Sequence, residues 1–312
     1  MTAPIVAITG ANGAIGPVVA EELARAGYDV RALTRRDADV LDRDALRRAF
    51  DGATGVVHLA AKLHIVDPPP ALRDEYRRVN VDGTANVIRA ASEAGVRRVV
   101  HVSTIAVYGY NDGRVLSEGS ETRPDTFYSR TKLESEKIAL DANAAVLRFA
   151  AVYGSRVKGN YRKLLHSISK GRFIPLGKGK NRRTLVYDRD AARTVVLALK
   201  SDASAGQIFN VTDGTFHTVR EILDAMATAL GRRVPRVSMP LAPIRFGIGI
   251  AERSLKMIGM RSPVTRSMID KYAEDVTVSS DKIRDVLGFR AEYDLERGWR
   301  ETVELMRQAG EL

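Results

Sequence analysis

Two side chains near the middle of the sequence have the chemistry to move a proton together. Tyr128 and Lys132 stand four residues apart in the stretch YSRTK, so on a helix they share one face. A free phenol has a pKa of about 10 and is a poor acid or base at neutral pH, but a neighbouring ammonium favours the phenolate. The pair therefore predicts proton transfer to or from an alcohol or carbonyl oxygen.

Two hydroxyl side chains end a predicted strand upstream of this pair. The run VVHVST finishes on Ser103 and Thr104, at the carboxyl edge of a parallel sheet, where open α/β folds bind their ligands. We predict that Thr104 hydrogen-bonds the same substrate oxygen as Tyr128. Ser103 is the alternative partner.

A glycine-rich loop indicates a phosphate-bearing cofactor. The stretch TGANGAIG follows the first predicted strand and opens the first predicted helix. A phosphate can approach a backbone closely only where side chains are absent, and a helix N-terminus supplies free N–H groups and partial positive charge. The loop therefore predicts a bound dinucleotide. Its contacts should come from Gly10, Asn12, Gly13, Ala14, Ile15 and Gly16.

The end of the second predicted strand indicates which dinucleotide binds. Folds selective for NAD place an acid there to accept from the ribose 2′-hydroxyl, but this chain reads ALTRR at 32–36. Arg35 and Arg36 suit a 2′-phosphate, which favours NADP(H) over NAD(H); the alternative is that both are solvated surface residues. Asp39, followed by Val40, either meets the adenine edge or caps the loop.

The elements around these residues alternate strands with helices, which is typical of a parallel sheet covered on both faces. We predict a doubly wound α/β sheet, the Rossmann fold, with a smaller C-terminal substrate-binding lobe. The dinucleotide-binding part should comprise 1–153 and about 184–215, and the lobe about 154–183 and 216–312. The expected strands are 5–9, 30–34, 56–59, 99–103, 146–149 and 207–211; the expected helices are 15–26, 45–50, 75–94, 128–141 and 219–230, with a less regular chain from 232.

Composition narrows the class of protein. With 45% hydrophobic and 28% charged residues, the 312-residue chain resembles an average globular protein. It has no cysteine and only five histidines, so we predict no metal site and no disulfide. The N-terminus enters an apolar strand without a secretory signal, which favours the cytoplasm. The formal net charge is +11, but no nucleic-acid motif appears, so we expect mostly solvated surface charge and no nucleic-acid partner.

No apolar run approaches the roughly 20 residues of a membrane span. The nearest candidate, 241–259, is interrupted by Arg245, Glu252 and Arg253. We expect an amphipathic helix that packs on the lobe rather than contacting a membrane.

Taken together, these stretches resemble the extended short-chain dehydrogenase/reductase family, as do VVHLAA at 56–61, VNVDGTANVIRAA at 79–91 and FNVTDG at 209–214. The resemblance implies that Tyr128 is the acid/base, that Lys132 lowers its pKa and binds the nicotinamide ribose, and that Thr104 contacts the substrate hydroxyl. It also implies that the backbone at Leu59, Ala60 and Ala61 lines the dinucleotide, and that the protein is a homodimer through paired helices.

The same resemblance narrows the substrate. Nucleotide-sugar dehydratases of the family carry an Asp-Glu pair directly after the strand-end Thr, whereas this chain has Ile105 and Ala106, which disfavours dehydration. The stretches at 152–165 and 175–187 are similar to bacterial UDP-sugar 4-epimerases and 4-ketoreductases. The resemblance implies substrate contacts from Lys158, Asn160 and Arg183, with Arg183 on the diphosphate.

The leading hypothesis is therefore the reduction of a UDP-4-keto sugar by NADPH. A UDP-hexose 4-epimerase with retained NAD is the first alternative. A reductase of a hydrophobic ketone, resembling the dihydroflavonol and 3β-hydroxysteroid branches, is the second, and 241–259 would then line its pocket. A non-catalytic dinucleotide sensor is the least favoured, because Tyr128, Lys132 and Thr104 are all present.

Overall fold

Six parallel strands form the central sheet of the protein. The computed structural model describes residues 2–63, 71–110, 113–157, 159–235, 238–257 and 272–312. The strand order is β2-β1-β3-β4-β5-β9, and each neighbouring pair is parallel, which confirms the predicted fold class. The strands are β1 (Ile5–Thr9), β2 (Asp29–Leu33), β3 (Gly55–His58), β4 (Arg98–Thr104), β5 (Ala145–Phe149) and β9 (Ile208–Val211).

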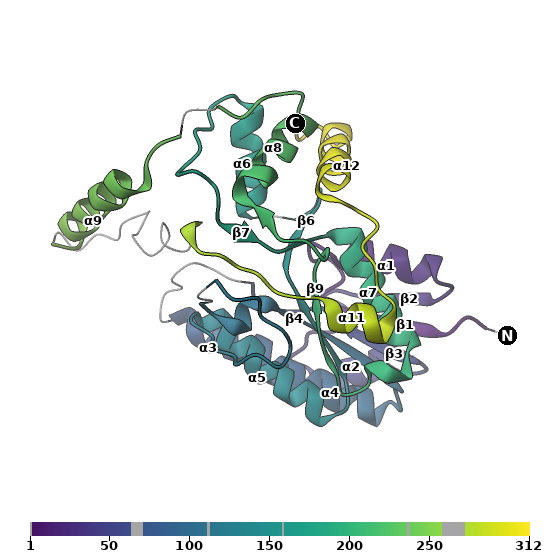
Figure 1. The fold of residues 1–312 in the computed structure, drawn as a ribbon. Helices are drawn as coiled ribbons and strands as arrows, with labels where there is room; N and C mark the ends of the chain where they lie inside the picture. Colours follow the sequence, from purple (N-terminus) through teal and green to yellow (C-terminus); the bar gives the residue numbers. More distant parts are fainter. Residues whose placement is uncertain (1, 64–70, 111–112, 158, 236–237, 258–271) are drawn as a thin grey trace.

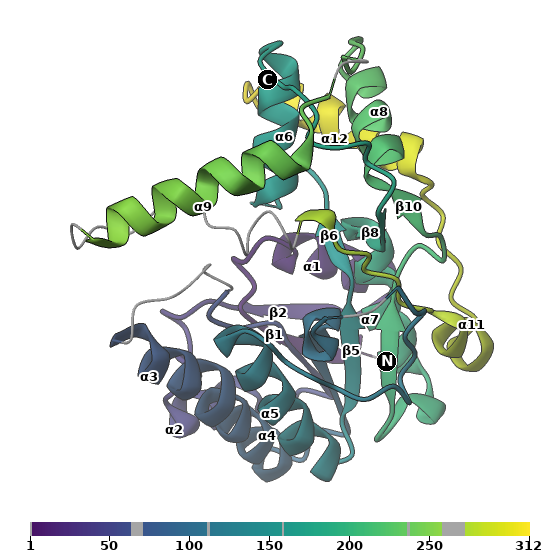
Figure 2. The ribbon, with the colours of Figure 1, turned by 60° about the vertical axis from the view of Figure 1, so that its left-hand side comes forward.

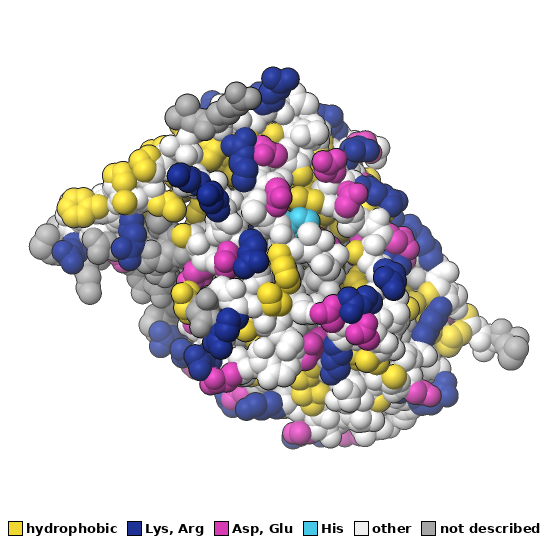
Figure 3. Space-filling view, viewed as in Figure 1, with side chains coloured by type: hydrophobic (Ala, Val, Ile, Leu, Met, Phe, Trp, Pro, Cys, Tyr) yellow, Lys and Arg dark blue, Asp and Glu magenta, His cyan; other side chains and the backbone are white. Residues whose placement is uncertain are grey.

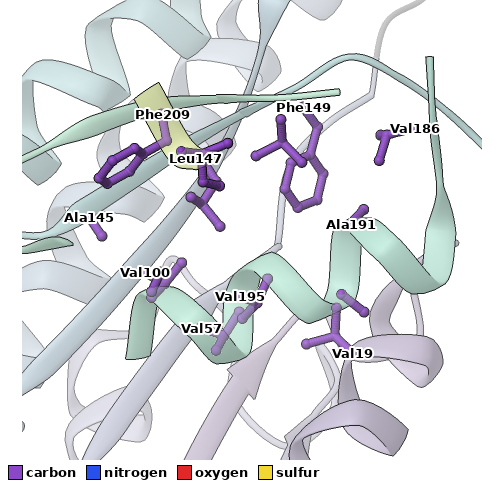
Figure 4. Close-up of a cluster of buried hydrophobic side chains, with 14 of the residues drawn as sticks. Val19, Val57, Val100, Ala145, Leu147, Phe149, Val186, Ala191, Val195 and Phe209 are labelled. Carbon is purple, nitrogen blue, oxygen red and sulfur yellow. The ribbon is translucent and has the colours of Figure 1, made fainter. Parts of the chain in front are cut away.

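Helices cover both faces of this sheet, so its central strands are apolar and buried (Figures 1 and 2). On one face, α1 (Gly16–Arg25) and α7 (Asp188–Lys200) pack Val19 and Val195 against Val57, Val100 and Leu147 (Figure 4). The other face is covered by α2 (Arg43–Ala49), α4 (Gly83–Glu93) and α5 (Phe127–Asp141).

The sheet topology places the ligand crevice. From β1 the chain crosses to β2 on one side, and it then returns to add β3 on the other side of β1. Open α/β sheets bind ligands at such a switch point, beyond the carboxyl ends of the two strands. The loop at Gly10 and the loop at Leu59 both leave the sheet there.

A second cluster of elements lies above the carboxyl edge of the sheet (Figure 1). Here α6 (Asn160–Ser169), α8 (Val219–Ala229) and α12 (Leu295–Gln308) enclose a separate core around Leu165, Met226 and Trp299. Tyr153 stacks on Trp299 with ring centroids 4.5 Å apart. Short strand pairs join this cluster to the sheet: β6 (Ala151–Tyr153) with β8 (Leu185–Tyr187), and β7 (Arg182–Arg183) with β10 (His217–Thr218).

Two local predictions differ from the structure. The helix expected at 75–94 is present as a continuous helical run from 71 to 93, but it contains a π-helical turn: α3 (Ala71–Arg77) is followed by the turn (Arg78–Asp82) and by α4, and Asn80 in the turn reaches across to Lys62. The chain after 232 is also more regular than expected, since it forms α9 (Leu241–Met257), α11 (Asp281–Leu287) and α12.

The predicted helix near 241–259 exists as α9, but its predicted packing is wrong. Figure 2 shows α9 projecting away from the lobe, and Phe246 and Ile250 on it are 66% and 51% exposed. Among the described residues, no helix combines the length and the apolar character that crossing a bilayer requires.

Candidate active site

Each of the three glycines of the phosphate loop is required for a different structural reason. Gly10 has φ +74°, and a Cβ atom there would lie 2.7 Å from the backbone of Ala60. A Cβ on Gly16 would overlap the carbonyl of Ala11. At Gly13 a Cβ would meet only the Gly10 carbonyl, at 3.0 Å. Gly10 and Gly16 thus let the chain pack on itself, and Gly13 leaves the open backbone that a phosphate can approach.

The helix that follows is left open at its N-terminus. Ile15 is the N-cap of α1 and gives no side-chain cap, Pro17 occupies the first turn, and that turn has no acidic residue. The first N–H groups of the helix therefore keep their capacity to bind an anion. This cradle fits the pyrophosphate of a dinucleotide.

The distinction between the glycines gives a first expected result. Gly13→Ala should weaken dinucleotide binding by about tenfold or more and barely change thermal stability, since the added methyl fills the cradle. Gly16→Ala should instead destabilise the fold by about 1–3 kcal/mol, because the methyl overlaps Ala11. Calorimetric titration and thermal melts of both variants check this. Equal loss of stability in the two variants would contradict the assignment.

The loop at 34–39 that follows β2, which we call the tip, is less positive than the arginines at 35 and 36 indicate. Arg35 Nε donates to Asp39 Oδ2 at 2.8 Å, and Asp39 Oδ1 also accepts from the backbone of Leu41. Asp37 folds back so that its Oδ2 accepts from both the amide and the hydroxyl of Thr34. No acid stands at 32–36, as the sequence indicates, but Asp37 and Asp39 follow directly and offset part of the charge of the arginines. Asp39 caps its own loop and holds Arg35, and only Arg36 keeps an exposed guanidinium without a bond to these two acids.

The loop after β3 is pinned by a residue that the sequence reading missed. Asn80, 1% exposed in the π-helical turn, accepts from Lys62 N at 2.7 Å, donates to Lys62 O, and donates to Thr131 of α5. These bonds fix the backbone at Ala60 and Ala61 beside Gly10. Asn80 could have been noticed in the sequence as a polar residue on the buried face of a predicted helix. Helical periodicity alone does not indicate what such a residue binds.

A buried histidine ties the same region together. His58 Nδ1 lies 2.7 Å from the Thr9 hydroxyl and its Nε2 lies 2.9 Å from Thr84 Oγ1, whose own proton goes to the Asn80 carbonyl. Burial lowers the pKa of His58 to about 3, so this side chain is neutral and structural. It links β1, β3 and the π-helical turn.

The structure puts the predicted pair on α5, at the carboxyl edge of β4. The helix starts with Thr126 in a capping box with Ser129, which fixes the first turn where Tyr128 stands. Burial, and then Tyr76 nearby, raise the pKa of Tyr128 to about 12. The expected lowering of this pKa is wrong, because burial and Tyr76 shift it upward. Tyr128 is therefore protonated at neutral pH.

Lys132 is anchored rather than extended towards solvent. It is 3% exposed, its Nζ donates to the Val102 carbonyl at 2.7 Å and lies 3.3 Å from His101 Nε2. Burial lowers the pKa of Lys132 to about 8, although Glu136 opposes the shift. The ammonium thus sits close to its titration range.

This shift predicts a specific pH dependence of stability. The native state loses the Lys132 proton near pH 8, whereas the unfolded chain keeps it until about 10.5, so the unfolded state binds more protons in this window. The free energy of unfolding should therefore rise between these pH values in the wild type relative to Lys132→Met. Urea unfolding of both proteins at several pH values measures the difference. A difference that stays flat or falls would contradict the burial of a charged Lys132.

The two hydroxyls at the end of β4 point to different places. Ser103, 4% exposed, donates to Glu136, so it is not available as the alternative substrate partner. Thr104 is half-buried, and its Oγ1 accepts from Ala106 N at 3.2 Å and caps the 3₁₀ turn Ile105–Tyr108. That contact uses a lone pair of Oγ1 and leaves the hydroxyl proton for another acceptor.

A buried ion pair links α5 to the central sheet. Arg148 of β5 and Glu136 of α5 are 3% and 1% exposed and approach to 2.7 Å. Arg148 also donates to the Tyr108 hydroxyl, which donates to Asn210 of β9. With Ser103, this network joins β4, β5 and β9 to the helix that carries the pair. It is another feature that sequence reasoning missed, because its members lie on five separate segments.

The structure describes two of the three predicted substrate residues. Asn160 begins α6 and is exposed, beside a small cavity that Tyr161 and Trp299 also line. Arg183 lies on β7, where its Nη2 donates to the Tyr272 carbonyl at 3.0 Å. Lys158 lies outside the described residues.

Comparison with known proteins agrees with this geometry. The family model described as "NAD dependent epimerase/dehydratase family" matches residues 6–212. The N-acetyl-alpha-D-glucosaminyl-diphospho-ditrans,octacis-undecaprenol 4-epimerase of Escherichia coli O157:H7 is 25% identical, over 96% of this chain and 94% of its own. The UDP-glucose 4-epimerase of Vibrio cholerae is 26% identical, over 97% and 95%. The solved structure "MoeE5 in complex with UDP-glucuronic acid and NAD" has a TM-score of 0.77 and 27% identity, covering 97% of this chain and 99% of that one.

The matched region contains the whole six-stranded sheet, the glycine loop, Thr104 and the pair on α5. The predicted family resemblance and enzyme class are thereby confirmed, and the protein is an NAD(P)-dependent enzyme of the short-chain dehydrogenase/reductase type. This chain belongs to the NAD-dependent epimerase/dehydratase family.

Proposed function

We propose that this protein reduces a UDP-4-keto sugar at C4 with NADPH. The observation that carries the proposal is the position of the pair: Lys132 Nζ donates to the Val102 carbonyl, two residues before Thr104, and Tyr128 lies one helical turn away on the same helix. A tyrosine is protonated at neutral pH and can act as a proton donor. A carbonyl that accepts a hydride needs such a donor at its oxygen. Relatives acting on UDP-sugars, and a structural neighbour bound to one, support the choice of substrate class.

The residues divide the reaction between them. A bound nicotinamide supplies the hydride to C4. Tyr128 gives its proton to the carbonyl oxygen, so that C=O becomes CH–OH, and Lys132 stabilises the phenolate left behind and holds the ribose. Thr104 orients the same oxygen with its free hydroxyl proton. Ile105 and Ala106 carry no carboxylate, so the additional acid and base that dehydration needs are missing from these two positions.

The lobe would hold the nucleotide diphosphate. Arg183 donates from Nη2 to the Tyr272 carbonyl, and its guanidinium would bind the phosphate oxygens of the diphosphate. Asn160 and Lys158 would line the same side. The division into a dinucleotide part and a substrate lobe, the homodimer and the cytoplasmic location stay predictions.

The cofactor preference depends on Arg36. With Arg35 held by Asp39, Arg36 is the guanidinium that would take the 2′-phosphate of NADP. Arg36→Ala should weaken NADP binding by about tenfold or more and leave NAD binding within about twofold. Calorimetric titration with both dinucleotides measures this. If Arg36→Ala weakened the binding of NADP and NAD equally, or changed neither, Arg36 would not be the residue that selects the 2′-phosphate.

A 4-epimerase that retains NAD is the second candidate. Asp39 pairs with Arg35, and Asp37 adds a second carboxylate next to Arg36, which suits the uncharged 2′-hydroxyl of NAD. The two functions separate in one experiment with purified protein. A reductase consumes added NADPH with a UDP-4-keto sugar, whereas an epimerase interconverts UDP-sugars without added cofactor. Failure of both assays with every UDP-sugar tried would remove the proposed substrate class.

A further inference from the structure

We propose that α9 and the loop beside it form a docking surface for an anionic lipid bilayer. The outer face of α9 carries Phe246 and Ile250, which are four residues apart and 66% and 51% exposed. The neighbouring pair, Ile244 and Ile248, is half-buried. Large apolar side chains this exposed on a helix that projects from the body mark an interaction surface.

The apolar surface continues from the helix onto an adjacent loop. Met239 N donates to the Pro175 carbonyl, and Gly177 N donates to the Met239 carbonyl. A Cβ on Gly177 would touch the side chain of Leu241, at the start of α9. Ile174 and Met239, 53% and 44% exposed, therefore lie beside the first turn of the helix. We call Ile174, Met239, Phe246 and Ile250 the α9 surface.

The charge around this surface identifies its partner. The two stretches that build it, 170–183 and 232–256, contain twelve Lys and Arg residues and a single acidic residue. Their formal charge of +11 equals the net charge of the whole chain, so the rest of the protein is formally neutral. Figure 3 shows Lys and Arg side chains beside the apolar side chains that run along α9. The exposed basic residues here include Arg172, Lys178, Lys180, Arg232, Arg233 and Arg253.

Apolar side chains surrounded by basic ones fit the headgroup region of an anionic bilayer. The apolar groups insert at the acyl boundary, and Lys and Arg meet the lipid phosphates. Each component is weak alone, and together they hold a helix in the plane of the surface. A second copy of this chain fits less well, because the same strongly basic surface would face itself.

Vesicle sedimentation of the full chain tests the proposal. With vesicles of phosphatidylcholine containing about one third phosphatidylglycerol, the wild type should pellet with the lipid and be released by high salt. With pure phosphatidylcholine it should stay in the supernatant. Phe246→Ser with Ile250→Ser, and separately Lys178→Glu with Lys180→Glu and Arg253→Glu, should each lower the bound fraction by about tenfold.

Matched variants outside the α9 surface serve as controls. Val115→Ser with Val286→Ser removes exposed apolar side chains elsewhere, and Lys137→Glu with Lys200→Glu reverses exposed charges on the sheet helices. Both controls should bind vesicles like the wild type. The proposal is overturned if the wild type ignores anionic vesicles, if the controls lose as much binding as the α9 variants, or if light scattering shows that the serine pair dissociates an oligomer without changing vesicle binding.

Discussion

Tyr128→Phe is expected to lower turnover by about a thousandfold while leaving the fold and dinucleotide affinity intact. The change removes only the hydroxyl that donates the proton, and general acid catalysis by one positioned group contributes about 10²–10⁴ in rate. Tyr128 is protonated at neutral pH even at its ordinary pKa of about 10, and burial raises this pKa further, to about 12. Initial rates at saturating cofactor and sugar, with calorimetric titration of the cofactor, measure both quantities.

A matched control is available for this prediction. Tyr28→Phe removes a hydroxyl at the amino end of β2, away from the carboxyl edge where the site lies, and should keep wild-type turnover. If Tyr128→Phe kept turnover within about tenfold of the wild type, another group would have to donate the proton. The α5 pair would then be structural, and a dinucleotide-sensing role would return.

Arg148→Met is expected to cause the largest loss of stability. It leaves the Glu136 carboxylate buried without its cation, and breaking a buried pair in this way costs about 3–5 kcal/mol. It also removes the donor to the Tyr108 hydroxyl. Chemical unfolding should show this decrease in the free energy of unfolding, together with a lower melting temperature.

The double variant distinguishes the broken ion pair from simple mispacking. With Glu136→Gln added to Arg148→Met, no net charge is buried at the site, so much of the lost stability should return. The Ser103 hydroxyl can still donate to the new amide oxygen. If the double variant were less stable than Arg148→Met, the loss would come from packing around Arg148 rather than from an uncompensated carboxylate.

The parts of the fold that repeat along the chain were predictable from sequence. Short buried strands alternate with amphipathic helices, and this pattern depends only on neighbours a few residues apart. The glycine loop was recognisable for the same reason, since its role is fixed by the strand before it and the helix after it. The Tyr128 and Lys132 spacing likewise needs only one helix.

Features that depend on a particular loop conformation or on distant contacts were not predictable. Asp37 returns to Thr34 through a loop conformation that no periodic pattern encodes, and it changes the charge of the tip. Asn80 acts through Lys62 and Thr131, which lie far from it in the sequence. The raised pKa of Tyr128 is a consequence of burial in the assembled fold, so the spacing of the pair pointed in the opposite direction.

The orientation of α9 was mispredicted for a related reason. Its sequence is compatible with packing on a lobe or lying at an interface, because the apolar residues cover most of its circumference. Which of these occurs depends on whether the lobe offers an apolar face at that place. The lobe closes its own core with α6, α8 and α12, and the outer face of α9 stays exposed.

The position to which the hydride is transferred is the most direct test of reduction at C4 of the sugar. Purified protein is mixed with a UDP-4-keto sugar and NADPH that carries deuterium at the transferred position of the nicotinamide, and the product is analysed by NMR. Reduction at C4 with Tyr128 as the proton donor predicts deuterium at C4 of the sugar with the wild type and almost none with Tyr128→Phe. Deuterium at any other carbon, or equal labelling by the two proteins, would contradict it.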